Sequence, residues 1–217
     1  QFVDFLKSVF THMAKNSKDG SIHFLCMDWR HIAEMMEATK DAYTELKNLC
    51  VWAKTNGGMG SLYRSQHELV FVFKSGQGKH TNNVELGRHG RNRTNVWSYP
   101  GVNTWGPSRG DLSLHPTVKP IALVADAILD CSSRKDIILD PFAGSGTTFL
   151  AAQKTGRNGY GIEIDPAYCD LIVERMRQAF GIEATLEATG EGFESIRRSR
   201  SANRASARTA EPNAEAA

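Results

Sequence analysis

Short apolar runs alternate with stretches of helical periodicity along most of this chain. Apolar residues at helical spacing predict helices over residues 2–15, 28–39, 120–131, 147–155 and 166–180. Apolar runs between them predict strands at residues 21–27, 48–53, 68–73, 136–140 and 158–163. Strands that alternate with helices are typical of an α/β fold, so we expect a mostly parallel sheet with helices on both faces.

Two stretches lack this periodicity. Residues 75–114 are rich in glycine and polar side chains, and we interpret them as an irregular insertion, which in a compact domain is usually functional or disordered. Residues 191–217 hold Ser, Ala, Arg, Asn and Glu with almost no bulky apolar side chain, and we expect a disordered tail. The chain therefore divides into a domain at residues 1–190 and this tail.

Composition limits the class of protein. At 217 residues with 41% hydrophobic side chains, the chain can build the core of one globular domain. No apolar run approaches the ~18 residues of a membrane helix, so we expect no membrane partner. Four cysteines are widely spaced without a zinc-binding pattern, so we expect no metal and a cytoplasmic protein whose thiols are buried: Cys26, Cys50, Cys131 and Cys169.

The net charge of +2 excludes a polycation, but positive charge gathers within the insertion. Residues 74–109 contain six Lys and Arg side chains and a single acid, Glu85. Asparagines and aromatic residues lie among them, and such a mixture suits phosphates, base edges and stacking. A solvated, flexible loop is the alternative interpretation. The candidate DNA contacts are Arg88, Arg91, Arg93 and Asn95.

The segment after residue 136 carries the candidate chemistry. An apolar strand runs into Asp140, a glycine turn follows, and a second strand ends at Glu163. This layout suits a nucleoside cofactor, because glycines let backbone N–H groups approach the ligand and the second acid can accept both ribose hydroxyls. A carboxylate before the turn would repel a phosphate, so Asp140 favours a cationic sulfonium ligand over NAD. Asp140 could instead be a turn-forming acid or a helix N-cap.

The residues of this candidate cofactor site share one strand, one turn and one helix start. Phe142 could pack beside the cofactor or belong to the core. The turn itself needs its glycines whether or not a ligand binds. The full set of candidates in this segment is Asp140, Phe142, Gly144, Ser145, Gly146, Thr147 and Glu163.

Asp140-Pro-Phe-Ala-Gly-Ser-Gly-Thr147 resembles the cofactor motif of the DNA methyltransferases that make N6-methyladenine or N4-methylcytosine. Three further segments resemble the same family in its permuted order, in which the cofactor motif is C-terminal. These segments are His115-Pro-Thr-Val-Lys-Pro120, Gln66–Lys74 and Asn95-Val-Trp97. The resemblance covers roughly residues 1 to 180.

The resemblance implies a Rossmann-like, S-adenosylmethionine-dependent methyltransferase fold and methyl transfer to an exocyclic amine of a base in double-stranded DNA. N6 of adenine is our default acceptor, and N4 of cytosine is the alternative. By the same resemblance, Thr117 and Lys119 line the cofactor site near the methionine end. A rigid loop bounded by prolines is the alternative for that segment.

One departure from the family affects the expected activity. The family's catalytic motif is Asp, Asn or Ser followed by Pro-Pro and an aromatic residue, and this chain has no two adjacent prolines. In the permuted order the motif would precede Gln1, on a central strand between residues 21–27 and the strand ending at Asp140. We therefore expect a fragment that lacks this strand, and we name no catalytic residue. A non-catalytic remnant that binds cofactor or DNA, and a different Rossmann enzyme acting with NAD or on a small molecule, are the alternatives.

Overall fold

The computed structural model describes residues 1–60, 62–88, 92–101 and 118–210, with backbone only from residue 203 onward. Thr117 and Arg91, two of the candidate site residues, lie outside the described residues. The helices, with one 3-10 turn (η1), are α1 (Phe2–Lys15), η1 (Trp29–His31), α2 (Ile32–Thr39), α3 (Ile121–Cys131), α4 (Thr147–Thr155), α5 (Pro166–Phe180) and α6 (Phe193–Ala210). The strands are β1 (Ile22–Met27), β2 (Glu45–Ala53), β3 (His67–Lys74), β4 (Val96–Ser98), β5 (Ile137–Asp140) and β6 (Asn158–Gly161).

The strands form two separate ladders. The first sheet has the order β1-β3-β2-β4, with β3 antiparallel to both neighbours and β4 parallel to β2. The second sheet is the parallel pair β5-β6. The expected mostly parallel sheet is therefore corrected to a mixed one, because β3 returns from β2 as a hairpin and runs antiparallel to both of its neighbours. Apolar runs in a sequence do not encode strand direction, so the pattern could not show this.

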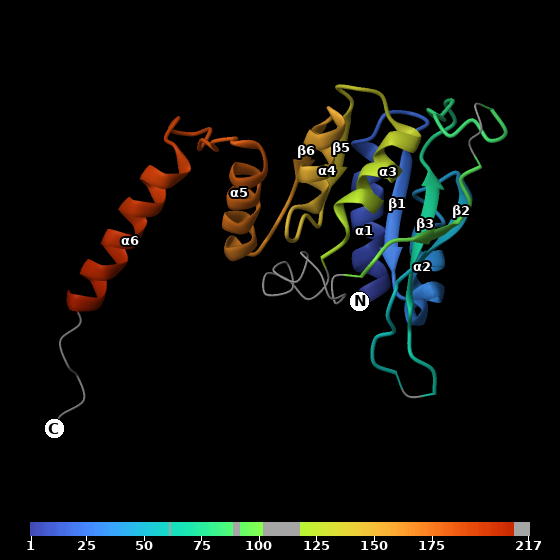
Figure 1. The fold of residues 1–217 in the computed structure, drawn as a ribbon, viewed down its shortest axis with the longest axis horizontal. Helices are drawn as coiled ribbons and strands as arrows, with labels where there is room; N and C mark the ends of the chain where they lie inside the picture. The colour runs from blue at the N-terminus through green and yellow to red at the C-terminus, as the bar shows by residue number, and fades with distance from the viewer. Residues whose placement is uncertain (61, 89–91, 102–117, 211–217) are drawn as a thin grey trace.

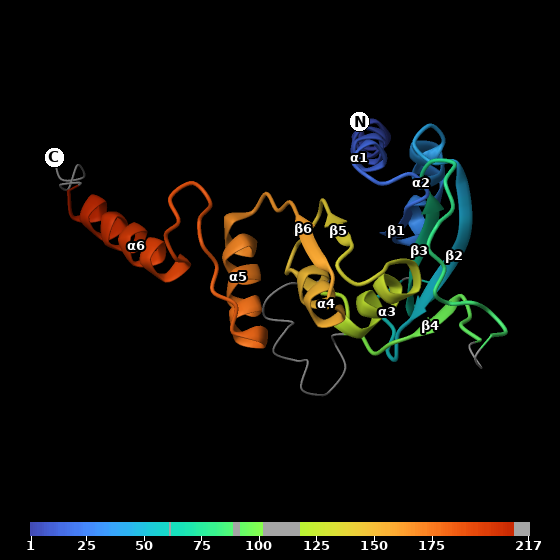
Figure 2. The same cartoon turned by 90° about the horizontal axis from the view of Figure 1, so that it is seen from above.

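Figures 1 and 2 place the strands across the molecule in the order β6, β5, β1, β3 and β2. Within the described residues no backbone ladder joins β1 to β5, and we call this position the sheet break. The β5 side of the sheet break carries apolar surface, since Ile137 is 66% and Leu139 is 38% exposed. The family resemblance places the strand with the catalytic motif at this position.

Helices cover both faces of the first sheet, as the apolar pattern predicts. Side chains alternate along β3, so Leu69, Phe71 and Phe73 pack with α1 and α2 on one face. Val70 and Val72 point to the other face, where they join Trp52, Trp97 and residues of α3. Burial on both sides explains why β3 is one continuous apolar run. A third cluster joins α3 to α4 and fixes the second sheet beside the first.

Two stretches predicted to be irregular contain regular structure. The insertion includes β4, where Val96 is in register with Val51 of β2. The tail predicted to be disordered forms α6 over Phe193–Ala210, which is a correction. Its Ala and Arg residues favour a helix, whereas its few bulky apolar residues leave residues 193–202 of α6 largely exposed. Among the helices of the described residues, none combines the length and apolar character needed to cross a bilayer.

Candidate cofactor site

Asp140 begins the turn that connects β5 to α4. Its Oδ1 accepts the backbone N–H of Phe142 at 3.0 Å, and its Oδ2 accepts the hydroxyl of Thr148 at 2.5 Å. The turn needs glycine at Gly144 and Gly146, whose φ angles are 51° and 83°. Asp140 is thus a turn-forming acid in this structure, and it is the last residue of β5, at the carboxyl edge where α/β sheets bind ligands.

Glu163 closes the same turn from the end of β6. Its Oε2 accepts the N–H of Gly144 at 2.7 Å, and its Oε1 accepts the N–H groups of Ile164 and Asp165, each at 2.9 Å. The structure therefore brings together the two carboxylates that the sequence predicts to share a site. A carboxylate has about four acceptor positions, so three N–H bonds leave room on Oε2 for a further donor such as a ribose hydroxyl.

Helix α5 packs against the glycine turn. A Cβ atom on Gly146 would lie 2.8 Å from Cγ1 of Ile172, so glycine is also required by close packing. The buried guanidinium of Arg175 donates to the carbonyl oxygen of Ser145 at 2.6 Å. Arg175 has no part in the sequence-based site, because a single arginine in an amphipathic helix gives no signal of its own. Its contact holds Ser145 buried beneath the turn.

Lys119 lies between the two sheets. Its Nζ is 3.9 Å from Oε2 of Glu68 on β3, and the hydroxyl of Thr147 donates to its carbonyl oxygen at 3.3 Å. The charge of Cys26 when ionised raises the pKa of Lys119, burial opposes this, and Glu68 and Asp140 raise it further. The neighbouring negative charges therefore favour the cationic form of Lys119.

Phe142 reaches across the same region. Its ring is 56% exposed and its centroid lies 6.1 Å from that of Phe5 on α1. Of the two sequence interpretations, a core residue is wrong for Phe142. An exposed ring beside the turn is suited to pack against a bound ligand.

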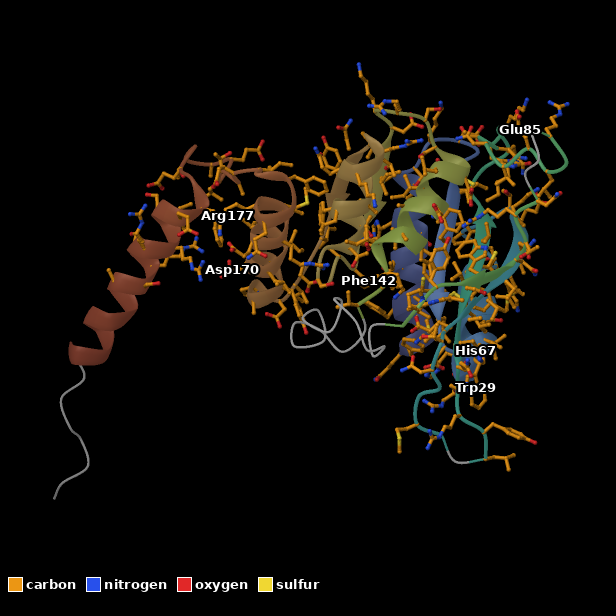
Figure 3. The ribbon with its side chains drawn as sticks, viewed as in Figure 1. Trp29, His67, Glu85, Phe142, Asp170 and Arg177 are labelled. Carbon is orange, nitrogen blue, oxygen red and sulfur yellow. The ribbon has the colours of Figure 1, made fainter. Side chains whose placement is uncertain are left out.

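The candidate DNA residues lie elsewhere. Figure 3 shows Glu85 at the end of the first sheet opposite Phe142. The side chain of Arg88 is exposed at that far end. The side-chain amide of Asn95 donates to Oδ1 of Asn48 at 3.3 Å and to the carbonyl of Leu49 at 3.2 Å, so it helps to hold β4 against β2.

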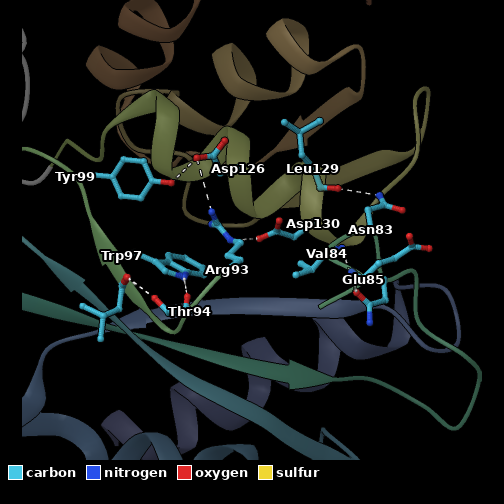
Figure 4. A network of polar contacts seen from close by, with 12 residues as sticks. Asn83, Val84, Glu85, Arg93, Thr94, Trp97, Tyr99, Asp126, Leu129 and Asp130 are labelled. Atoms are coloured by element: carbon cyan, nitrogen blue, oxygen red, sulfur yellow. Dashed lines mark hydrogen bonds and ion pairs between the residues drawn. The ribbon is translucent and has the colours of Figure 1, made fainter. Parts of the chain in front are cut away.

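Arg93 is the centre of a polar network that fastens the insertion to α3 (Figure 4). Its Nε lies 2.6 Å from Oδ2 of Asp130 in an ion pair without hydrogen-bond geometry, and its Nη1 lies 3.9 Å from Asp126. The guanidinium carbon is 4.8 Å from the ring centroid of Trp97, and the hydroxyl of Tyr99 donates to Asp126. Because its charge faces Asp126 and Asp130, Arg93 has a structural role. The sequence pattern does not predict this role.

The cysteines differ in their surroundings. Cys50 is buried, and burial raises the pKa of its thiol to about 11. Cys169 is exposed, so the expectation that the thiols are buried is wrong for it. It lies on α5 beside Glu163, whose carbonyl is 3.6 Å from its sulfur. No cluster of three or more potential metal ligands occurs in the part of the chain that the structure describes.

Comparison with curated proteins finds type II methyltransferases. The chain is 28% identical over 168 residues to the type II methyltransferase M2.MboI of Moraxella bovis, covering 74% of this chain and 60% of the relative. It is 32% identical over 158 residues to M.HpaI of Haemophilus parainfluenzae (67% and 46%) and 45% identical over 89 residues to M.ScaI of Streptomyces caespitosus (40% and 29%). The chain thus spans between 29% and 60% of the length of these relatives.

Solved structures show the same fold. The M1.HpyAVI complex with SAM superposes with a TM-score of 0.67 at 22% identity, covering 80% of this chain and 82% of the other. The cytosine-N4-specific PvuII DNA methyltransferase gives 0.63 at 17% identity, with 77% and 69% covered. The family model N6_N4_Mtase, described as DNA methylase, matches residues 1–174. With a match of that extent, this chain belongs to the N6_N4_Mtase family of DNA methylases.

Proposed function

We propose that this protein transfers a methyl group from S-adenosylmethionine to the N6 amine of adenine in double-stranded DNA. The observation that carries the proposal is the pair of carboxylates, Asp140 and Glu163, fastened to one glycine turn at the carboxyl edge of β5 and β6. Membership of the DNA methylase family supports the reaction class.

The residues of the turn fit a nucleoside with a cationic side chain. The close approach of Gly146 to Ile172 leaves the inner side of the turn packed, so a ligand meets the outer side. There, Oε2 of Glu163 is suited to a ribose hydroxyl in a charge-assisted hydrogen bond. Asp140 adds negative charge near a sulfonium or an α-amino group. Lys119 is placed to pair with a carboxylate at the methionine end. When bound, S-adenosylmethionine supplies an electrophilic methyl group.

Cytosine N4 is the second candidate acceptor. It is favoured by the structural similarity to PvuII DNA methyltransferase, whose title specifies cytosine N4. A third candidate, a protein that binds cofactor or DNA without turnover, is favoured by the absence of adjacent prolines in the 217 residues. These three possibilities differ in the product that each would leave on DNA.

The test has two stages. Calorimetry should show that the 217-residue chain binds S-adenosylmethionine and that NAD does not compete. A longer version that includes the coding sequence preceding Gln1 is then incubated with DNA and labelled S-adenosylmethionine, and the nucleosides are analysed by mass spectrometry. N6-methyladenine supports the proposal, N4-methylcytosine selects the second candidate, and cofactor binding without a methylated base selects the third. Competition by NAD, or no binding of S-adenosylmethionine, would overturn the cofactor assignment.

A further inference from the structure

The described residues between β2 and β3, 54–60 and 62–66, form the two arms of a connection that we call the β2–β3 hairpin. Its stem is ordered by backbone bonds from Lys54 N–H to the Gln66 carbonyl at 2.9 Å and from Gly58 N–H to the Ser65 carbonyl at 2.8 Å. The side-chain amide of Gln66 adds a bond to the carbonyl of Lys54 at 2.8 Å. A Cβ on Gly60 would lie 2.1 Å from the carbonyl oxygen of Tyr63, so the two arms approach too closely at Gly60 for a side chain.

The tip exposes large apolar side chains. Met59 is 89% exposed, and Leu62 and Tyr63 are each 83% exposed. Large apolar side chains that are gathered in one exposed place typically mark a surface that meets a partner. The ordered stem shows that this exposure is not a consequence of an unstructured loop.

A fourth exposed large side chain, that of Trp29, lies beside the stem. The indole N–H of Trp29 donates to the hydroxyl of Ser65 at 3.1 Å, and the Trp29 side chain is 51% exposed. The guanidinium carbon of Arg30 lies 5.7 Å from the centroid of that ring. Trp29 belongs to η1, directly after β1, so two separate segments of the chain contribute to one aromatic and basic surface.

The hairpin itself is basic, and Asp28, which precedes Trp29, is an exposed acid beside it whose carboxylate accepts the backbone N–H of Arg30. No Asp or Glu occurs between Lys54 and His67, while Arg64 is exposed within the hairpin and Arg30 is exposed beside it. Lys54 forms an ion pair with Glu68 at 2.6 Å, so its charge is already compensated within the protein. Basic side chains interleaved with exposed rings and apolar side chains are suited to a polyanion with stacked bases.

The position of the hairpin relates it to the candidate cofactor site. Figure 3 shows Trp29 and His67 at the same end of the sheet as Phe142, and the hairpin extends from that end in Figure 1. Because β1, β2 and β5 all present their carboxyl ends there, the hairpin and the glycine turn border the same edge of the molecule. The far end, with Glu85 and Arg88, lies away from the site.

We propose that the β2–β3 hairpin is a DNA-contacting element. Its tip, formed by Met59, Leu62 and Tyr63, packs against bases of a duplex whose backbone is held by Arg30 and Arg64. The proposal rests on the proposed function in that the duplex is the methylation substrate. It adds a contact surface at the cofactor edge, separate from the insertion at residues 75–114. A duplex opened or kinked by an apolar wedge would present a base at this edge.

The test compares a hairpin variant with a matched variant at the far end. Met59→Ser, Leu62→Ser and Tyr63→Ser are combined, and Leu86→Ser, which removes a side chain that is 67% exposed near Glu85, is the control. Anisotropy with a labelled 30-base-pair duplex is measured over a range of salt concentrations, and calorimetry measures binding of S-adenosylmethionine. We expect the triple variant to lose at least tenfold in DNA affinity and the control to lose none. Arg64→Ala should lower the log–log salt slope by about one.

The outcomes separate this inference from the proposed function. Equal DNA affinity of wild type and triple variant overturns the hairpin proposal and leaves the proposed function intact. No DNA binding by the wild-type protein overturns both. Sedimentation adds a further arm: if the wild type is a dimer and the triple variant a monomer with unchanged DNA affinity, the tip is a protein interface and the proposal fails. Ultraviolet crosslinking of 5-iodouracil DNA to Tyr63, mapped by mass spectrometry, is the expected positive result.

Discussion

The backbone N–H of Gly144 donates to the carboxylate of Glu163 at 2.7 Å, so the turn after β5 is fastened to the end of β6. This bond makes the two ends of the parallel pair one unit. The affinity of a ligand that contacts Glu163 therefore also depends on the conformation of the glycine turn. The same side chain stabilises the turn and makes the proposed ribose contact, so a substitution of Glu163 must be tested for both stability and cofactor binding.

Glu163→Ala should weaken binding of S-adenosylmethionine by about 1.5–3 kcal/mol, the range for hydrogen bonds to a charged group. This corresponds to a dissociation constant roughly 10- to 150-fold higher in calorimetry. Glu187→Ala, which removes an exposed carboxylate outside the site, is the control. Thermal unfolding shows whether the loss of the Gly144 bond has unfolded the turn. An unchanged dissociation constant in a folded Glu163→Ala variant would exclude the ribose role.

Arg93→Ala should destabilise the fold by about 3 kcal/mol, because it leaves the partly buried carboxylates of Asp126 and Asp130 without their cation. Denaturant unfolding measures the change. The slope of DNA affinity against salt should not alter, since the guanidinium is already engaged within the protein. Arg88→Ala is the matched control, with little expected effect on stability. A reduced salt slope without loss of stability in Arg93→Ala would restore Arg93 as a DNA contact.

Acid should destabilise the protein through His23. This side chain is 7% exposed, its Nδ1 lies 2.9 Å from the hydroxyl of Tyr43, and burial lowers its pKa from 6.5 to about 4. Above pH 6.5 the ring is neutral in both states and no stability is lost. Between pH 6.5 and about 4 the unfolded chain takes up a proton that the folded chain does not, which costs about 1.4 kcal/mol per pH unit.

Unfolding free energies measured at intervals from pH 7 to pH 4 test this directly. His23→Gln should be less stable at pH 7 but should show a flatter dependence over the window. His12→Gln, at an exposed position, should keep the wild-type dependence. If His23→Gln retains the full slope, the titration belongs to other groups.

The 217-residue chain by itself should transfer no methyl group to DNA. It has no adjacent prolines, so no segment of it matches the catalytic motif of the family. The exposed apolar side chains of Ile137 and Leu139 at the sheet break should also make it prone to association. A radiolabel transfer assay on a soluble sample that binds S-adenosylmethionine is the measurement. Label incorporated into DNA would falsify this expectation.

Local patterns predicted most of the fold correctly, and the exceptions have physical causes. α1 and α5 follow from amphipathic spacing, and α5 begins as expected, with the carboxylate of Asp165 accepting the N–H of Ala167. The direction of β3 is seen only in its pairing with β1 and β2, which apolar spacing does not encode. The helix in the tail shows that low hydrophobicity predicts a lack of packing rather than a lack of helix.

The candidate site was predictable where its residues are close in sequence. The strand, glycine turn and second acid are local, and the structure joins Asp140, Gly144 and Glu163 as expected. Contacts between distant segments carry no such signal, which is why Arg175 and the network of Arg93 were missed. Exposure is likewise decided by the whole fold, so the pattern could not distinguish the solvent-facing Phe142 from a core residue.

The network of Arg93 also constrains how this protein could exchange parts with its relatives. The insertion is fastened to α3 by one guanidinium facing Asp126 and Asp130, and Asn83 adds bonds to the carbonyl groups of Leu129 and Ser132. In a chimaera whose residues 75–101 come from a relative, the two acids of α3 come from this protein and the cation must come from the relative. Recombination within the segment would separate the two, so viable crossovers should keep Arg93 and α3 from the same parent.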